Sequence, residues 1–256
     1  MISELAYIDK GAKIGNNVII EPFAYIGDDV VIGDGCVIKS HASILSGTRM
    51  GSNNKIYQGA VIGASPQDFH YKGGPTEIRI GNDNVIRENV IIARSSEEGG
   101  ATVIGNHCHI MASAHLCHDV CLDDYVVVGL KSIVAGRSHL STCSILSNAA
   151  IIQQSVVVGK WSLIQSGTRI SKDVPPYIVV SGNPAEYHGV NSVILQNNDF
   201  HRVDDKIMRH IMTSYLIVYQ TGISTEDAIG RIKTQVPKSE EIEDIISFLE
   251  HTKGII

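Results

Sequence analysis

The chain has 256 residues, of which 43% are hydrophobic and 19% are charged, a composition typical of a globular protein rather than a disordered one. Its formal net charge of -6 argues against general binding to nucleic acid or to acidic membrane surfaces, so we expect local recognition of its partners. No apolar stretch has the length of a membrane span, and the N-terminus lacks the layout of a signal peptide, so we expect a cytoplasmic protein.

The cysteines are odd in number and scattered along the chain, which fits reduced thiols better than a disulfide framework. Cys117, His118 and Cys121 have a spacing that could begin a zinc site, but no second ligand cluster follows at the spacing that such sites use. We therefore expect small core residues at the cysteine positions and assign no metal.

A repeat of six residues extends from the N-terminus to residue 170. An aliphatic residue occupies every sixth position from Ile8 to Ile62, from Ile80 to Ile92 and from Ile104 to Ile170, with Met50 as one variant. A small residue usually follows four positions later, and glycine often follows the aliphatic residue directly. A helix would require spacings of three and four, so the repeat predicts short strands instead.

Each hexad is predicted to form a strand and a corner: the aliphatic residue fills a narrow triangular core, and the small residue lets the chain turn without steric conflict. Three hexads complete a coil, and stacked coils place residues eighteen apart above one another. The repeat resembles that of the hexapeptide acyltransferase superfamily. This resemblance implies a mainly β fold, a left-handed parallel β-helix over residues 1–186, and a homotrimer. A large apolar lateral face would favour such self-association.

Two segments interrupt the repeat. They are residues 68–79, which contain Gly73-Gly74-Pro75, and residues 94–103, which contain Gly99-Gly100. Both are predicted to be loops extruded from the coil. Such loops often carry the functional face of a repeat protein, although a tolerated surface insertion has the same pattern.

The repeat stops after Ile170, and residues 187–256 are predicted to form a helical C-terminal domain. Ser224-Thr225 and Lys238-Ser239 each precede two acidic residues, as is typical of capped helix N-termini. Upstream of both caps, apolar residues recur at helical spacing and are predicted to line one buried stripe: Met208, Ile211, Met212, Tyr215, Leu216 and Tyr219.

The repeat carries an unusual polar segment in which His118 stands directly beside Asp119. Because Leu116 is the inward residue of its hexad, His118 and Asp119 should lie at the corner and on the outer wall. A lone histidine is usually an ordinary surface residue, but an imidazole beside a carboxylate can accept a proton near neutral pH. This pair is therefore the first catalytic candidate.

The eighteen-residue register places Gly136 directly above His118, and Gln154 one coil further along the same column. A glycine leaves its backbone N–H unobstructed, as a donor to a developing oxyanion requires. On the hexad pattern alone Gly136 would merely turn a corner, but its pairing with His118 favours the donor role. The Gln154 amide could orient a substrate.

Several motifs, spread over essentially the whole chain, resemble those of the acyl-ACP:UDP-N-acetylglucosamine O-acyltransferases. They are Ala114 to Asp119, Pro66-Gln67-Asp68 with Gly74-Pro75-Thr76, Ile86-Arg87-Glu88-Asn89-Val90, Asp173-Val174-Pro175-Pro176-Tyr177 and Gly189-Val190-Asn191. The resemblance implies transfer of an acyl chain, usually 3-hydroxylated, from acyl carrier protein to the 3-hydroxyl of UDP-N-acetylglucosamine. This reaction is the first step of lipid A synthesis and uses no metal or separate cofactor.

The resemblance also implies roles for individual residues. His118 would be the general base, Asp119 would orient it, and the N–H of Gly136 would stabilise the oxyanion. Substrate contacts are expected at Gln67, Asp68, His70, His115, Gln154 and Asn191. Acyl carrier protein is acidic, so Arg202, Lys206 and Arg209 are candidates for docking it, although a solvated helix face is equally consistent with these residues.

Some positions depart from the family pattern. His70 replaces the usual lysine, Arg137 and Gln153 stand where histidine is frequent, and Asn197 and Asn198 replace paired arginines. Amides lack the charge and the fork of donors with which arginine holds phosphate, so the departures concern specificity more than chemistry. Two other interpretations therefore remain: a paralogous acyl- or acetyltransferase with a different amino-sugar nucleotide or other acceptor, and a scaffold without turnover.

Overall fold

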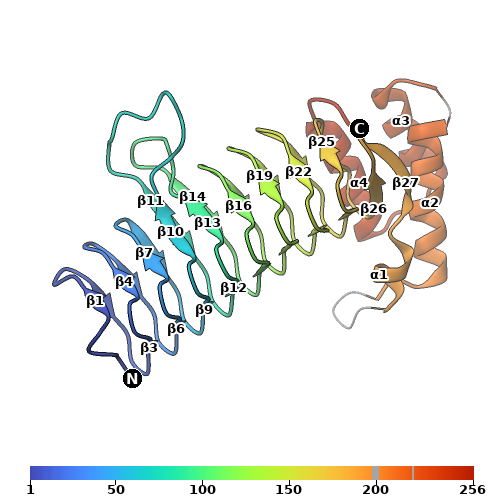
Figure 1. The fold of residues 1–256 in the computed structure, drawn as a ribbon. Coiled ribbons are helices and arrows are strands. Elements are labelled where there is room, and N and C mark those ends of the chain that lie inside the picture. Colours follow the sequence, from blue (N-terminus) through green and yellow to red (C-terminus); the bar gives the residue numbers. More distant parts are fainter. Residues whose placement is uncertain (198–201, 221) are drawn as a thin grey trace.

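The computed structural model describes residues 1–197, 202–220 and 222–256. The chain winds into a long parallel β-helix from its N-terminus, and a group of helices packs at the C-terminal end (Figure 1). Within the described residues, the strands form three sheets, named here after their first strands as the β1, β2 and β3 sheets.

The β1 sheet contains β1 (Tyr7–Ile8), β4 (Tyr25–Ile26), β7 (Ser43–Ile44), β10 (Val61–Ala64), β13 (Ile91–Ala93), β16 (His115–Leu116), β19 (Ile133–Val134), β22 (Ile151–Ile152) and β25 (Arg169–Ile170). The β2 sheet contains β2 (Lys13–Ile14), β5 (Val31–Ile32), β8 (Thr48–Met50), β11 (Glu77–Ile80), β14 (Ala101–Ile104), β17 (Cys121–Leu122), β20 (His139–Leu140) and β23 (Val157–Val158). The β3 sheet contains β3 (Ile19–Ile20), β6 (Val37–Ile38), β9 (Lys55–Ile56), β12 (Val85–Ile86), β15 (His109–Ile110), β18 (Val127–Val128), β21 (Ile145–Leu146), β24 (Leu163–Ile164), β26 (Ile178–Ser181) and β27 (Glu186–Val190).

The predicted stacking register is confirmed. Leu116 pairs with Val134 in adjacent parallel strands, eighteen residues on, and both are fully buried. The small residue of most hexads is buried as well, as at Ala42 and Ala150, so it adds to the core beside the turn.

The turn itself is made by the residue just before the small one, which has a positive φ at successive corners. Most of these residues are not glycine, although a left-handed conformation costs roughly 1–2 kcal/mol for other residues. Stacking between coils offsets part of this cost. The rings of Phe23 and His41 lie 5.2 Å apart, and those of His107 and Tyr125 lie 4.8 Å apart.

Both predicted loops are present, and they project from the same side of the β-helix between β10 and β11 and between β13 and β14 (Figure 1). The first spans residues 65–76, three residues earlier than expected, and the second spans residues 94–100 and is shorter than expected. Arg79 and Val103 were assigned to loops, but they pair with each other in β11 and β14. Their outward side chains obscured the strand pattern.

The C-terminal helices are α1 (Ser192–Asn197), α2 (Asp205–Gln220), α3 (Thr225–Gln235) and α4 (Glu240–His251). Ser224 and Ser239 cap α3 and α4, as predicted. The expected boundary between residues 186 and 187 falls within β27, so the division into two domains stays a prediction. Within the described chain, no helix has the length and apolar character that crossing a membrane requires.

The predicted apolar stripe of α2 is only partly buried. Met208, Ile211 and Tyr215 are buried, whereas Met212 and Leu216 are 45% and 49% exposed. The inclusion of Met212 and Leu216 in the stripe was therefore wrong, because they lie on the outer side of the helix. The five cysteines are free thiols; Cys117 and Cys121 are half-buried and the others are buried.

Candidate active site

His118 and Asp119 lie at the corner between β16 and β17, where the chain passes from the β1 sheet to the β2 sheet. Asp119 is the left-handed corner residue, with a φ of 60°, and its N–H donates to Thr102 Oγ1 at 2.9 Å. His118 is 9% exposed, yet its ring lines a surface cavity rather than the core. The backbone thus fixes both groups at the wall, as the sequence predicted.

The imidazole of His118 is oriented by the carboxylate of Asp119. His118 Nδ1 lies 2.7 Å from Asp119 Oδ2, so a protonated Nδ1 donates a hydrogen bond to the carboxylate, and Nε2 is left as an acceptor. The Ser96 hydroxyl lies 3.2 Å from Nδ1 and donates to Asp119 Oδ2 at 2.8 Å. Ser95 donates to the other carboxylate oxygen. The carboxylate is therefore held from both sides.

These contacts decide the charge of Asp119. Burial alone would raise the pKa of its carboxyl, but hydrogen bonds from Ser95, His118 and Ser96 outweigh burial and hold the pKa below its ordinary value of 3.8. Asp119 is therefore ionised in the folded chain near neutral pH, and it keeps His118 in the tautomer whose Nε2 can accept a proton.

Asp119→Asn is expected to destabilise the chain at neutral pH. A depressed pKa contributes stability that is present above the ordinary pKa and is lost as the pH falls through the folded-state pKa. The gap in unfolding free energy between the wild type and Asp119→Asn should stay constant from pH 7 to about pH 5 and shrink below about pH 4. Urea unfolding over this range measures it, and a gap that does not change with pH would contradict the assigned contacts.

Gly136 packs directly against the ring of His118. A Cβ at position 136 would lie 2.6 Å from His118 Cε1 and 2.7 Å from Nε2, closer than real Cβ contacts. The Arg137 N–H donates to the His118 carbonyl at 3.1 Å and holds the two coils in register. Within the described part of the chain, the N–H of Gly136 has no hydrogen-bond acceptor. The predicted pairing of 118 with 136 is therefore present in the structure.

A cavity of about 300 Å³ opens beside this pair. Asp68 Oδ2 lies 3.6 Å from His118 Nε2 and 3.9 Å from Arg137 Nη2. The His70 N–H bonds to Asp68 and is the main reason why the pKa of Asp68 lies below its ordinary value. The structure thus gathers most of the predicted contacts around Nε2 of His118. The cavity is lined by Gln67, Asp68, Phe69, His70, His118, Arg137 and Gln154.

Other predicted substrate residues lie elsewhere. His115 is half-buried on the outer face of β16, and it does not line the cavity. Asn191 is buried, and its amide donates to the Trp161 carbonyl at 2.9 Å. Their substrate roles stay predictions.

The positions that depart from the family pattern are also scattered. Arg137 faces the cavity and its Nε lies 3.3 Å from Glu97 Oε1, whereas Gln153 lies beside the guanidinium of Arg169. Asn197 ends α1 and donates to the Val193 carbonyl, and Asn198 lies outside the described residues. Ser95, Ser96 and Glu97 were not predicted, because they reach the site through the fold of the second loop and no motif marks them.

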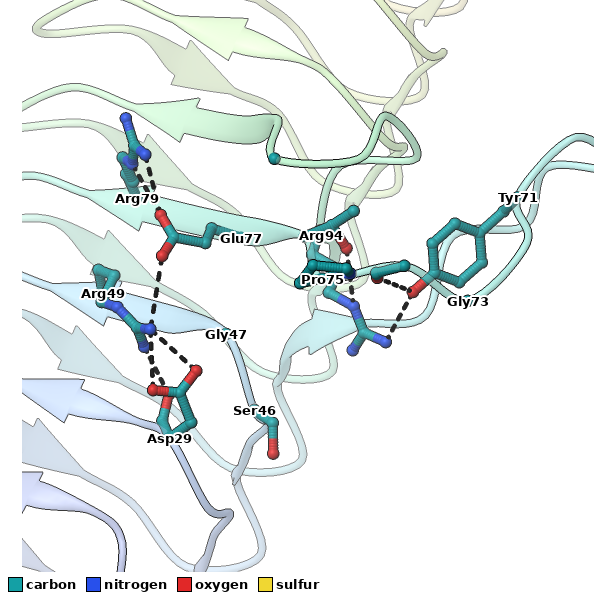
Figure 2. A pocket seen from close by; sticks show the side chains of 13 residues that line it. Asp29, Ser46, Gly47, Arg49, Tyr71, Gly73, Pro75, Glu77, Arg79 and Arg94 are labelled. Atoms are coloured by element: carbon teal, nitrogen blue, oxygen red, sulfur yellow. Dashed lines mark hydrogen bonds and ion pairs between the residues drawn. The ribbon is translucent and has the colours of Figure 1, made fainter.

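A second cavity, of about 530 Å³, lies on the N-terminal side of the first loop (Figure 2). Its cations are already paired: Arg49 contacts the carboxylates of Asp29 and Glu77, and Arg79 contacts Glu77. Arg94 points into the loop instead, where Nε donates to Thr76 Oγ1 at 3.1 Å and Nη2 to the Tyr71 hydroxyl at 3.2 Å. Arg94 thus ties together the two loops that carry the active-site side chains.

Arg94→Ala is expected to lower kcat/KM about tenfold, because Asp68 belongs to the loop that Arg94 holds. Arg79→Ala is the matched control. It also removes a guanidinium from this cavity, but the Arg79 side chain is 62% exposed and makes one ion pair. The kcat/KM of Arg79→Ala should therefore stay within about twofold of the wild type. Steady-state kinetics of both variants tests the loop contact, and equal losses would contradict it.

Comparison with known proteins identifies the family. Residues 173–256 match the model described as UDP N-acetylglucosamine O-acyltransferase, domain 2, and residues 11–46 match that of the bacterial transferase hexapeptide, six repeats. An acyl-[acyl-carrier-protein]–UDP-N-acetylglucosamine O-acyltransferase of Syntrophobacter fumaroxidans is 34% identical over 100% of this chain and 99% of its own length. The chain belongs to this family of O-acyltransferases.

Solved structures of the family agree with this assignment. A UDP-N-acetylglucosamine acyltransferase of Bacteroides fragilis is 42% identical, with a TM-score of 0.95 and 100% of both chains covered. A related structure from Acinetobacter baumannii is 32% identical, with a TM-score of 0.95 over 100% of this chain and 99% of that one. The expected fold, a left-handed parallel β-helix of hexapeptide repeats with C-terminal helices, is thereby confirmed.

Proposed function

We propose that this chain transfers an acyl group, 3-hydroxylated as in the family pattern, from acyl carrier protein to the 3-hydroxyl of UDP-N-acetylglucosamine, the first step of lipid A synthesis. The observation that carries the proposal is the packing of the His118 ring between the Asp119 carboxylate and the backbone of Gly136, at the mouth of a polar cavity. Full-length similarity to O-acyltransferases of this specificity supports it.

In the first step, His118 Nε2 takes the proton of the sugar hydroxyl as the hydroxyl oxygen attacks the thioester carbonyl carbon. The Asp119 carboxylate accepts a hydrogen bond from the Nδ1–H of the imidazolium and stabilises its charge. Asp68, 3.6 Å from Nε2, is a second carboxylate that favours the same charged state. The two carboxylates thus lower the energy of the transition state without any metal ion.

This attack leaves a tetrahedral oxyanion at the N–H of Gly136, which has no acceptor among the described residues, and in the second step the intermediate collapses. The carbonyl is restored, the carbon–sulfur bond breaks, and the thiolate of the carrier protein leaves. His118 returns its proton to that sulfur, so the enzyme ends in its starting state. The thioester supplies the activated acyl group, and these steps use no further cofactor.

Substrate recognition is proposed for the other side chains of the cavity. Gln67, His70 and Gln154 supply hydrogen-bonding groups beside His118, and Arg137 adds a positive charge. Arg137 is suited to a phosphate oxygen because its guanidinium is always charged and presents several donors. Arg137 thus supplies a positive charge to a chain that has amides at positions 197 and 198, where the family pattern has arginines.

We also propose a homotrimer that works in the cytoplasm. Ile133 and Ile151 are paired neighbours on the outer face of the β1 sheet and are 42% and 41% exposed. Such an apolar column favours a second copy of the chain. His115 lies in the same column, paired with Ile133, so a partner subunit at this face would bring His115 to a site between subunits. Sedimentation equilibrium measures the assembly directly.

Docking of the acyl carrier protein is proposed at the start of α2. Arg202, Lys206 and Arg209 are exposed there, and their charges complement an acidic carrier protein. Asp204 and Asp205 stand between them, so part of this positive charge is neutralised locally.

The test of the function is donor and acceptor dependence. With 3-hydroxyacyl carrier protein as donor, release of the free carrier thiol is expected only when UDP-N-acetylglucosamine is present. Consumption of acetyl-CoA, or turnover only with another amino-sugar nucleotide, would replace the proposal by the paralogue interpretation. A folded chain that binds the nucleotide sugar but turns over no donor would replace it by the scaffold interpretation.

A further inference from the structure

A group of side chains of the metal-ligating types lies on the outer face of the β2 sheet, beginning two residues after Asp119. The group is Cys121 on β17, Asp123 just after it, and His139 on β20. Their donor atoms, a thiol sulfur, a carboxylate oxygen and a ring nitrogen, all lie within 4.8 Å of one another. None of the three takes part in the proposed acyl transfer, so the group needs a separate explanation.

The β-helix holds the three residues in place. Cys121 and His139 are direct partners in the parallel pairing of β17 with β20. The backbone N–H groups of Cys121 and Asp123 donate to the carbonyls of Ser138 and Leu140, each at 2.9 Å. Asp123 and His139 already contact each other, with 2.9 Å between Oδ1 and Nε2. Binding of an ion would therefore require little rearrangement of the backbone.

We propose that Cys121, Asp123 and His139 form a binding site for a divalent transition metal of the zinc class. Zinc is bound by thiolate, imidazole and carboxylate at about 2.0–2.3 Å, which places neighbouring ligand atoms roughly 3–4 Å apart in a tetrahedral shell. The mixed sulfur, nitrogen and oxygen set excludes calcium and magnesium, which take oxygen ligands. Three protein ligands leave one tetrahedral position for water.

The two exposed ligands support an accessible site. The side chains of His139 and Asp123 are 41% and 37% exposed, so an ion can reach them from solvent. Asp123 also lines a cavity of about 300 Å³, together with Lys160 of the β-helix and Asp244 of α4. An ion at this position ties β17 to β20 close to the point where the helices meet the β-helix.

The site has a thermodynamic consequence because its ligands come from two coils. Cys121 and Asp123 approach His139 only in the folded chain, so an ion that binds them stabilises the folded state. Thermal unfolding of the metal-free chain should therefore shift upward when zinc is added. The eighteen-residue register stacks His139 on Cys121, but the approach of Asp123 depends on side-chain directions that the repeat does not specify.

The test uses the full chain, stripped with a chelator and titrated with cobalt, whose bond to a thiolate gives a near-ultraviolet charge-transfer band. The wild type is expected to bind one ion and develop the band. Cys121→Ser should abolish the band, and Asp123→Asn and His139→Gln should each weaken binding at least about tenfold. Unfolding of each variant without metal checks that its fold is intact.

Cys117→Ser is the matched control, since Cys117 is also half-buried and lies in the same coil but outside the group. It should leave the band and the affinity unchanged. The proposal is overturned if the wild type shows no band, if the band survives in Cys121→Ser, or if Cys117→Ser removes it. Should Cys121→Ser fail to fold, undiminished affinity in both Asp123→Asn and His139→Gln would overturn it equally.

Discussion

Replacing His118 with alanine is expected to lower kcat about 10²–10⁴-fold, the range that a positioned general base contributes. The ring presents Nε2 to the cavity, and within the described residues the cavity holds one further imidazole, that of His70, which is exposed at the loop. The Asp119 carboxylate would remain but would have no imidazole to orient. Steady-state turnover at saturating concentrations of both substrates measures the loss.

The control for His118→Ala is His109→Ala, which removes an exposed imidazole from the preceding coil, at β15. It should retain wild-type turnover. His118→Ala should also unfold cooperatively near the wild-type temperature, because its side chain lies at the wall and the core aliphatic residues are untouched. Residual turnover within tenfold of the wild type in a well-folded His118→Ala chain would remove His118 from the role of base.

Gly136→Ala is expected to lower kcat about 10²–10³-fold, although it adds a single methyl group. The new Cβ would lie 2.6 Å from the His118 ring, so the ring or the coil must move. Either movement breaks the alignment between Nε2 and the N–H of residue 136. Because the backbone of Gly136 is not in the left-handed region, the effect follows from this contact and not from strain.

Gly27→Ala provides the matched control for Gly136→Ala. Gly27 also lies in a hexad, one place closer to the aliphatic residue than Gly136 does, and a Cβ there would approach its nearest neighbour, the Ser46 nitrogen, at 3.3 Å. Turnover and unfolding temperature of Gly27→Ala should both stay close to the wild-type values. If Gly136→Ala retains full kcat while its structure shows the ring in place, the N–H is not part of the oxyanion site.

The sequence predicted the parts of the structure that repeat. The hexad alone places Leu116 in the core and stacks position 136 on position 118, because the pairing of parallel strands repeats at fixed length. The same periodicity cannot describe residues that leave the coil. Ser95 and Ser96 contact Asp119 through a loop whose path depends on its own contacts, including those of Arg94.

Two further misses have equally physical causes. The helical spacing of Met212 and Leu216 matches that of their buried neighbours, but which side of α2 meets the rest of the fold is set by tertiary packing. His139 stands eighteen residues after Cys121, so the register stacks these two, but the contact of His139 with Asp123 depends on side-chain directions that the repeat does not specify. In both cases the information lies in contacts between elements and not in the local pattern.

The most direct measurement of the central claim is a crystal structure of the chain with UDP-N-acetylglucosamine bound. The sugar 3-hydroxyl is predicted to lie within about 3 Å of His118 Nε2, on the side of the ring that faces the N–H of Gly136, with Asp119 still bonded to Nδ1. A nucleotide sugar bound in the cavity beside Arg94, or a 3-hydroxyl directed away from His118, would contradict the account.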